Sequence, residues 1–140
     1  MRLITLLMVS FMLGGNSSLI PSHSKTMGFI KKNEGKVLQT YPDGKFKRTG
    51  QSKYSGCWGN QFDENGKRFK HVTKFTHTWC EKIFYTHYFK RTIKKIPKHI
   101  IGNKFTVYAD TIYQWGSFSI SKMKSHPERG RLKLWHEKDL

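Results

Sequence analysis

Apolar and polar residues alternate through the middle of this chain, which is the pattern of β-strands with one buried face. The longest such stretch is His71–Phe89, where Phe75 and Trp79 would share a face and the later residues are mostly aromatic or β-branched. A strand usually has about 3 to 10 residues, so we expect a break or bulge near residues 81–82. The pattern therefore predicts two consecutive strands here.

Two short segments have the composition of tight turns. In residues 42–44 (PDG), the proline presets its φ angle and the glycine accepts a left-handed conformation. Residues 65–66 (NG) are the stronger hairpin signal, because a type I′ turn needs positive φ at both central positions. Closure by these two residues would place Phe62 opposite Phe69.

The second half of the chain continues with short segments typical of strands. We expect strands at Phe105–Tyr108 and Ser117–Met123, separated near residues 115–116, and a last strand in the tail that contains Leu132 and Leu134. Many short strands with glycine and asparagine turns are typical of compact all-β domains. The sequence therefore predicts a mainly β fold, a small antiparallel β-sandwich or barrel.

One strongly basic segment departs from the alternation. In FKRTIKKIPKHIIGN, Ile93 and Ile96 recur at a spacing that fits a helix, and Pro97 ends that pattern. We expect one short basic helix or an extended basic loop at this point.

The N-terminus has the order of a secretory signal peptide. Arg2 precedes the apolar run Leu3–Leu13, and small and polar residues follow. The run is about half of the roughly 20 apolar residues that a membrane span requires, so we expect removal rather than integral membrane association. Three small residues suit the position before the cut: Gly15, Ser18 and Ser24. We expect a signal peptide in residues 1–24, cleaved within 15–24, and a single secreted β-rich domain in residues 25–140.

The charge of the chain restricts its partners. Lys and Arg number 26 against 9 Asp and Glu, a formal net charge of +17. Such an excess favours association with polyanions, such as nucleic acid or an acidic protein face, and predicts binding that weakens steeply with salt.

The only two cysteines, Cys57 and Cys80, each adjoin a tryptophan. An exported protein meets an oxidising compartment, so we expect a disulfide between them, closing a loop of about 24 residues. Zinc is the alternative, with His71 and His77 as further ligands, but the spacings H-x5-H and H-x2-C are not those of common zinc knuckles. A reactive thiol is the third interpretation; the tryptophan neighbours favour burial instead. We expect no metal and no cofactor.

The basic segment and the aromatic residues before it form a candidate binding surface, because cationic and aromatic side chains together bind single-stranded nucleic acid without reading its sequence. A merely solvated charged face is the competing interpretation. The candidate residues are Lys90, Arg91, Lys94, Lys95, Lys98, Tyr85 and Tyr88.

A metal-independent ribonuclease is the catalytic alternative. Its chemistry needs a base, an acid and cations near a phosphate. The candidate residues are His77, His126, Glu128 and His136. We find no Ser-His-Asp spacing, phosphate-binding glycine loop or metalloprotease motif in the sequence.

In size, export signal, cysteine pair and charge, the chain resembles the small secreted effector proteins that pathogens release into hosts. Periplasmic inhibitors and cationic antimicrobial proteins share that description. The leading hypothesis is a secreted cationic binding protein, of effector or virulence type, that binds an acidic protein, RNA or another polyanion of a host or target cell without catalysis. The alternatives are a secreted ribonuclease and a secreted or periplasmic protein inhibitor.

Overall fold

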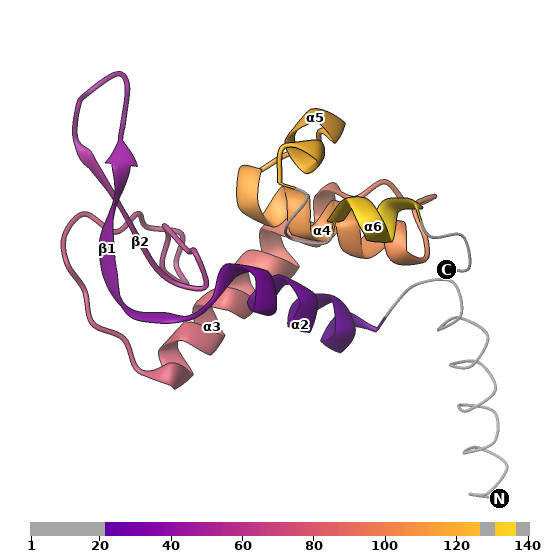
Figure 1. Ribbon diagram of the computed structural model, residues 1–140. Coiled ribbons are helices and arrows are strands. Elements are labelled where there is room, and N and C mark those ends of the chain that lie inside the picture. The colour runs from indigo at the N-terminus through magenta and orange to yellow at the C-terminus, as the bar shows by residue number, and fades with distance from the viewer. Residues whose placement is uncertain (1–21, 127–130, 137–140) are drawn as a thin grey trace, which may run out of the picture. The chain divides into compact units, whose positions relative to one another are not determined.

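The computed structural model describes residues 22–126 and 131–136, which contain five α-helices and one two-stranded antiparallel sheet (Figure 1). The helices and strands are α2 (His23–Glu34), β1 (Val37–Lys45), β2 (Ser52–Cys57), α3 (His77–His87), α4 (Asn103–Trp115), α5 (Ile120–Lys124) and α6 (Arg131–His136). A π-helical turn, η1 (Tyr88–Thr92), and a 3₁₀ turn, η2 (Ile93–Lys95), continue α3. None of the helices in these ranges has both the length and the apolar character needed to cross a bilayer.

The chain forms two compact units. Unit 1 comprises Met1–Phe29 and Ile96–Leu140, and unit 2 comprises Ile30–Lys95. Helix α2 begins in unit 1 and ends in unit 2. The expected signal peptide lies almost wholly outside the described residues, and its latest cleavage point, Ser24, falls in the first turn of α2.

The predicted mainly β fold is wrong. The described residues are predominantly helical, and their only two strands form one open hairpin, so neither a sandwich nor a barrel is present there. The expected basic helix is the end of a longer helical stretch that starts at His77 and runs through η2. The error arose because aromatic and β-branched residues pack equally well on a buried helix face, where tertiary contacts override their strand propensity.

The segment predicted as two strands within His71–Phe89 contains α3 instead. Cys80, Ile83, Phe84 and Tyr88 are all buried and recur at intervals of three and four residues, which is the helical period. Tyr85, which a strand would place on the same face as Ile83, is 47% exposed. Only the start of this segment has strand character: Thr73–Phe75 pairs with β1 through two backbone hydrogen bonds of 2.8 Å.

Thr76 determines where α3 begins. Its backbone is extended, and its hydroxyl accepts a hydrogen bond of 3.0 Å from the backbone N–H of Trp79. We expect Thr76→Ala to lower the free energy of unfolding by about 1 kcal/mol, because the helix loses its N-cap acceptor. Thr78→Ala, at an exposed position two residues later, is the matched control and should cost nothing. Chemical denaturation followed by circular dichroism distinguishes them; equal midpoints would contradict the assignment of the cap.

The remaining predicted strands are also helices. Phe105–Tyr108 lies within α4, Ser117–Met123 overlaps α5, and the expected last strand is α6. The expected break near residues 115–116 is the end of α4, where Gly116 has φ 81° and its N–H donates to the carbonyl of Ile112. Gly116 therefore ends an element at the expected place, but that element is a helix rather than a strand.

Both predicted turns lie close to points where the chain reverses direction, but the residues that pair across each turn differ from the expected ones. β1 includes residues 42–44, and the chain reverses beyond them, between Phe46 and Gln51, whose backbones pair at 2.9 Å. Residues 65–66 do close a hairpin, but Phe62 pairs with Arg68 rather than with Phe69. The Asp63 carboxylate accepts hydrogen bonds from two backbone N–H groups of this turn and so favours a longer loop.

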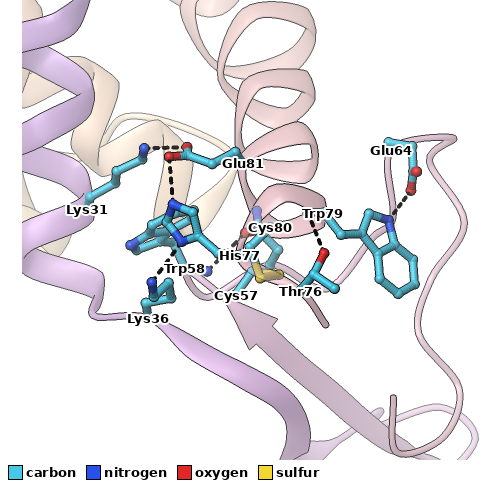
Figure 2. The surroundings of a disulfide bond; sticks show 11 residues. Lys31, Lys36, Cys57, Trp58, Glu64, Thr76, His77, Trp79, Cys80 and Glu81 are labelled. Atoms are coloured by element: carbon cyan, nitrogen blue, oxygen red, sulfur yellow. Dashed lines mark hydrogen bonds and ion pairs between the residues drawn. A yellow bond between two sulfur atoms is a disulfide. The ribbon is translucent and has the colours of Figure 1, made fainter. Parts of the chain in front are cut away.

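The predicted disulfide is confirmed: Cys57 at the end of β2 is bonded to Cys80 in α3 (Figure 2). Both residues are fully buried. Trp58 packs edge-on against Phe84, with ring centroids 5.5 Å apart. The core of unit 2 is therefore built around the connection between the hairpin and α3.

In unit 1, α4 supplies most of the core and contacts α6 (Figure 1). Asp110 of α4 and Arg131 of α6 are both fully buried and form an ion pair. The Arg131 guanidinium also donates to the side-chain oxygen of Gln114 at 2.5 Å and lies 4.8 Å from the centroid of the Trp115 ring. A charged contact thus links the two helices inside the core of unit 1.

Candidate functional site

Cationic and aromatic side chains alternate along one side of unit 2. Arg68 lies 4.5 Å from the centroids of both the Phe46 and the Phe62 rings. Lys53 lies 5.2 Å from the Phe46 centroid, and Arg91 lies 4.9 Å from the Phe62 centroid. These are cation–π distances, and the five residues Lys53, Phe46, Arg68, Phe62 and Arg91 form what we call the cation–aromatic row.

Local structure explains how distant parts of the sequence meet in this row. Phe46 and Lys53 come from the two sides of the β1–β2 hairpin, and Phe62 and Arg68 are paired across the second hairpin. Arg91 comes from η1. Its guanidinium passes close to Gly66, where a Cβ would lie 2.6 Å from Nη2 and where φ is 84°. The turn favours glycine at this position because φ is positive, whereas a Cβ would require only the flexible end of Arg91 to move.

The three cations of the row have no acidic partner: no ion pair formed within the described part of the chain includes Lys53, Arg68 or Arg91. Arg68 and Arg91 lie 4.5 and 4.9 Å from the same ring centroid, so their charges are closer than the Debye length of about 10 Å at 0.1 M salt. Arg68 donates to Gln61 Oε1 at 3.1 Å, which uses few of its N–H donors. Positive charge is thus held in place without a carboxylate from the part of the chain that the structure describes.

Further exposed cations lie on the same two hairpins: Lys45, Lys47, Arg48, Lys67 and Lys70. Tyr41 of β1 adds no negative charge at physiological pH. Partial burial, and to a smaller extent the carboxylates of Asp43 and Glu34, raise the pKa of its hydroxyl above the ordinary value, so the phenol stays protonated. The two hairpins that carry the row therefore contain more cations than carboxylates.

Two hollows adjoin the row. The smaller, about 350 Å³, is lined by Phe46, Gln51, Ser52, Tyr54, Arg68, Phe69 and Lys70. The larger, about 610 Å³, is lined by Asp63, Lys67, Arg68, Phe69, Lys70, His71, Thr73 and Trp79. Arg68, Phe69 and Lys70 line both hollows, so the two hollows are neighbours. Trp79 is held at the edge of the larger one because its indole N–H donates to Glu64 at 2.8 Å.

A second charged group surrounds Trp58 beside the disulfide (Figure 2). Lys36 Nζ lies 2.8 Å from His77 Nδ1, and His77 Nε2 lies 3.4 Å from Glu81. Glu81 also pairs with Lys31 at 2.6 Å, and Lys31 lies 4.3 Å from the centroid of the Trp58 ring. The Glu81 carboxylate is thus shared between Lys31 of α2 and His77 of α3. This charged group therefore connects α2 with α3.

The structure places the sequence-predicted binding residues in different environments. Lys90, Lys94, Lys95 and Lys98 are exposed, and Lys98 belongs to unit 1 whereas the others belong to unit 2. Arg91 joins the row. Tyr85 is exposed and stacks on Phe89 at 5.7 Å, whereas Tyr88 is fully buried and takes no part in a surface.

The candidate catalytic residues are not brought together within one unit. His77 lies in unit 2, His126 and His136 lie in unit 1, and Glu128 is outside the described residues. His126 is held against the Trp115 ring at 4.8 Å, with Ser125 Oγ 2.9 Å from Nδ1.

The sulfur atoms of Cys57 and Cys80 are bonded to each other, so neither is a thiolate ligand for zinc in this state. Over the described ranges, no three His, Cys, Asp or Glu side chains are grouped as metal ligands.

The sequence did not predict the cation–aromatic row, although the hairpin signal at residues 65–66 placed Phe62 within one residue of its partner Arg68. Comparison with known protein families and with curated proteins gives no match, so functional inference depends on the site itself.

Proposed function

We propose that this chain is a secreted cationic binding protein that binds a polyanion through the cation–aromatic row of unit 2. The observation that carries the proposal is the row itself: two phenylalanine rings hold three cations close together, and none of the three pairs with a carboxylate of residues 22–126 or 131–136. Like charges in such proximity repel one another, and an anionic ligand relieves that repulsion.

The surroundings of the row support the same function. The net charge of +17 steers a polyanion toward the protein, and the exposed lysines and arginine of the two hairpins extend the positive field around the row. The rings restrict the motion of the guanidinium groups, so less conformational entropy is lost when they bind. In keeping with an effector role, the target would be a component of a host or a rival cell.

Binding to labelled single-stranded RNA, heparin and anionic vesicles, measured by fluorescence anisotropy or co-sedimentation at about 50 and 200 mM salt, tests this proposal. We expect affinity for at least one of them to fall by a factor on the order of ten or more across that range, because bound cations release counterions from the polymer. Absence of salt-sensitive binding to all three would contradict the proposal.

A further inference from the structure

We propose that the smaller hollow is a subsite for one base of a single-stranded nucleic acid, and that Arg68 and Lys70 at its rim hold the adjoining phosphate. This inference rests on the proposed function and names its ligand. The hollow combines two chemistries that a nucleotide needs together, aromatic walls and cations.

The aromatic walls come from three side chains. Phe69 is 7% exposed, so it lies beneath the surface, and Phe46 and Tyr54 are half-buried beside it. Ser52 and Gln51 contribute hydroxyl and amide groups to the same lining. The volume of about 350 Å³ lies at the lower end of the range for small-ligand pockets, roughly 300 to 1,000 Å³. A flat base fits such a space and gains stacking energy there.

The aromatic lining favours a nucleic acid over other polyanions. A sulfated glycan offers charge to Arg68 and Lys70 but has no aromatic ring to stack on Tyr54. A duplex offers phosphates, but its bases are stacked within the helix and reach such a pocket only when unpaired. The expected ligand is therefore a single strand.

The larger hollow gives this strand a path. Arg68, Phe69 and Lys70 border both hollows, so a phosphate held between them would direct the neighbouring base toward Trp79. The indole is fixed by its hydrogen bond to Glu64 and provides a rigid stacking platform. Asp63, which also borders this hollow, accepts hydrogen bonds from backbone N–H groups, so its charge is partly compensated.

The test compares two single-stranded oligonucleotides of equal length, one with bases and one fully abasic, on the oxidised full chain. Both carry the same phosphates, so any difference in affinity reports on the bases. We expect the oligonucleotide with bases to bind more tightly by a factor on the order of ten. Binding should also quench tryptophan fluorescence, because a base stacks on Trp79.

Two variants test whether the smaller hollow is responsible for the preference for bases. Tyr54→Leu keeps apolar volume but removes a stacking wall, and it should reduce the preference for bases severalfold while leaving abasic binding unchanged. Tyr41→Leu is the matched control: Tyr41 lies on the same hairpin, is 41% exposed and lines neither hollow, so the preference should persist. Equal affinities of the natural protein for both oligonucleotides, with salt-sensitive binding retained, would overturn the base subsite alone. If the natural protein bound neither oligonucleotide nor any other polyanion, that result would instead contradict the proposed function.

Discussion

Replacing Asp110 by asparagine is expected to lower the free energy of unfolding by about 3 to 5 kcal/mol. Asp110 and Arg131 are both 0% exposed, and the carboxylate compensates the guanidinium charge inside the core of unit 1. Asparagine preserves the shape of the side chain but removes the carboxylate that pairs with the buried Arg131 guanidinium. Natural proteins have a stability of only about 5 to 15 kcal/mol, so this single change removes a large share of it.

The control is the double variant Asp110→Ala with Arg131→Met. Replacing both partners by apolar residues that are no larger than the originals removes the uncompensated charge without overpacking the core, so this variant should be more stable than the single one. Urea denaturation of the natural protein and the two variants, followed by circular dichroism, measures both differences. A loss below about 1 kcal/mol for the single variant would show that the pair behaves as an exposed salt bridge.

Removing the disulfide is the second large effect that we expect. Cys57 and Cys80 are separated by 23 positions, and on the chain-entropy model closing such a loop stabilises the folded state by about 3 kcal/mol. The bond joins β2 to α3 within the core of unit 2. The double variant Cys57→Ala with Cys80→Ala should therefore unfold at clearly lower denaturant concentration than the oxidised protein.

Reduction provides the matched control for this experiment. A thiol reductant should shift the unfolding midpoint of the natural protein toward that of the double variant, and it should leave the double variant unchanged. Titration of the folded, oxidised protein should detect no reactive thiol. Two titratable thiols in that state, or a midpoint insensitive to reductant, would contradict the disulfide.

The disulfide was predictable because the prediction depended on the number of cysteines and on the expected compartment rather than on secondary structure. The helices were not, because two of the three buried residues of α3, Ile83 and Phe84, are of the β-branched and aromatic types that are enriched in strands. Two local signals were present: Thr76 can cap a helix, and Cys80, Ile83 and Phe84 have helical spacing. Neither outweighed strand propensity in the absence of information on which face is buried.

The sequence predicted the type of binding surface but not the residues that form it. Net charge and aromatic content indicated cation–aromatic recognition, but contiguity in sequence directed attention to residues 90–98. The row instead combines residues from four segments, of which only Arg91 lies in that stretch. The expected hairpin register placed Phe69 opposite Phe62, and this difference of one residue concealed the contact between Phe62 and Arg68. Long-range contacts of this kind depend on the tertiary fold.

The most direct test of the central claim is the salt dependence of single-stranded RNA binding for two variants of equal net charge. One replaces the row cations Lys53, Arg68 and Arg91 by glutamine, and the other replaces Lys90, Lys94 and Lys98, all exposed in the basic segment, by glutamine. Because each contact to a single strand contributes about 0.7 to the slope of log affinity against log salt, the row variant should lose about 2 from that slope. The segment variant should keep nearly the slope of the natural protein. Equal losses in the two variants, or a larger loss in the segment variant, would contradict the assignment of polyanion binding to the row.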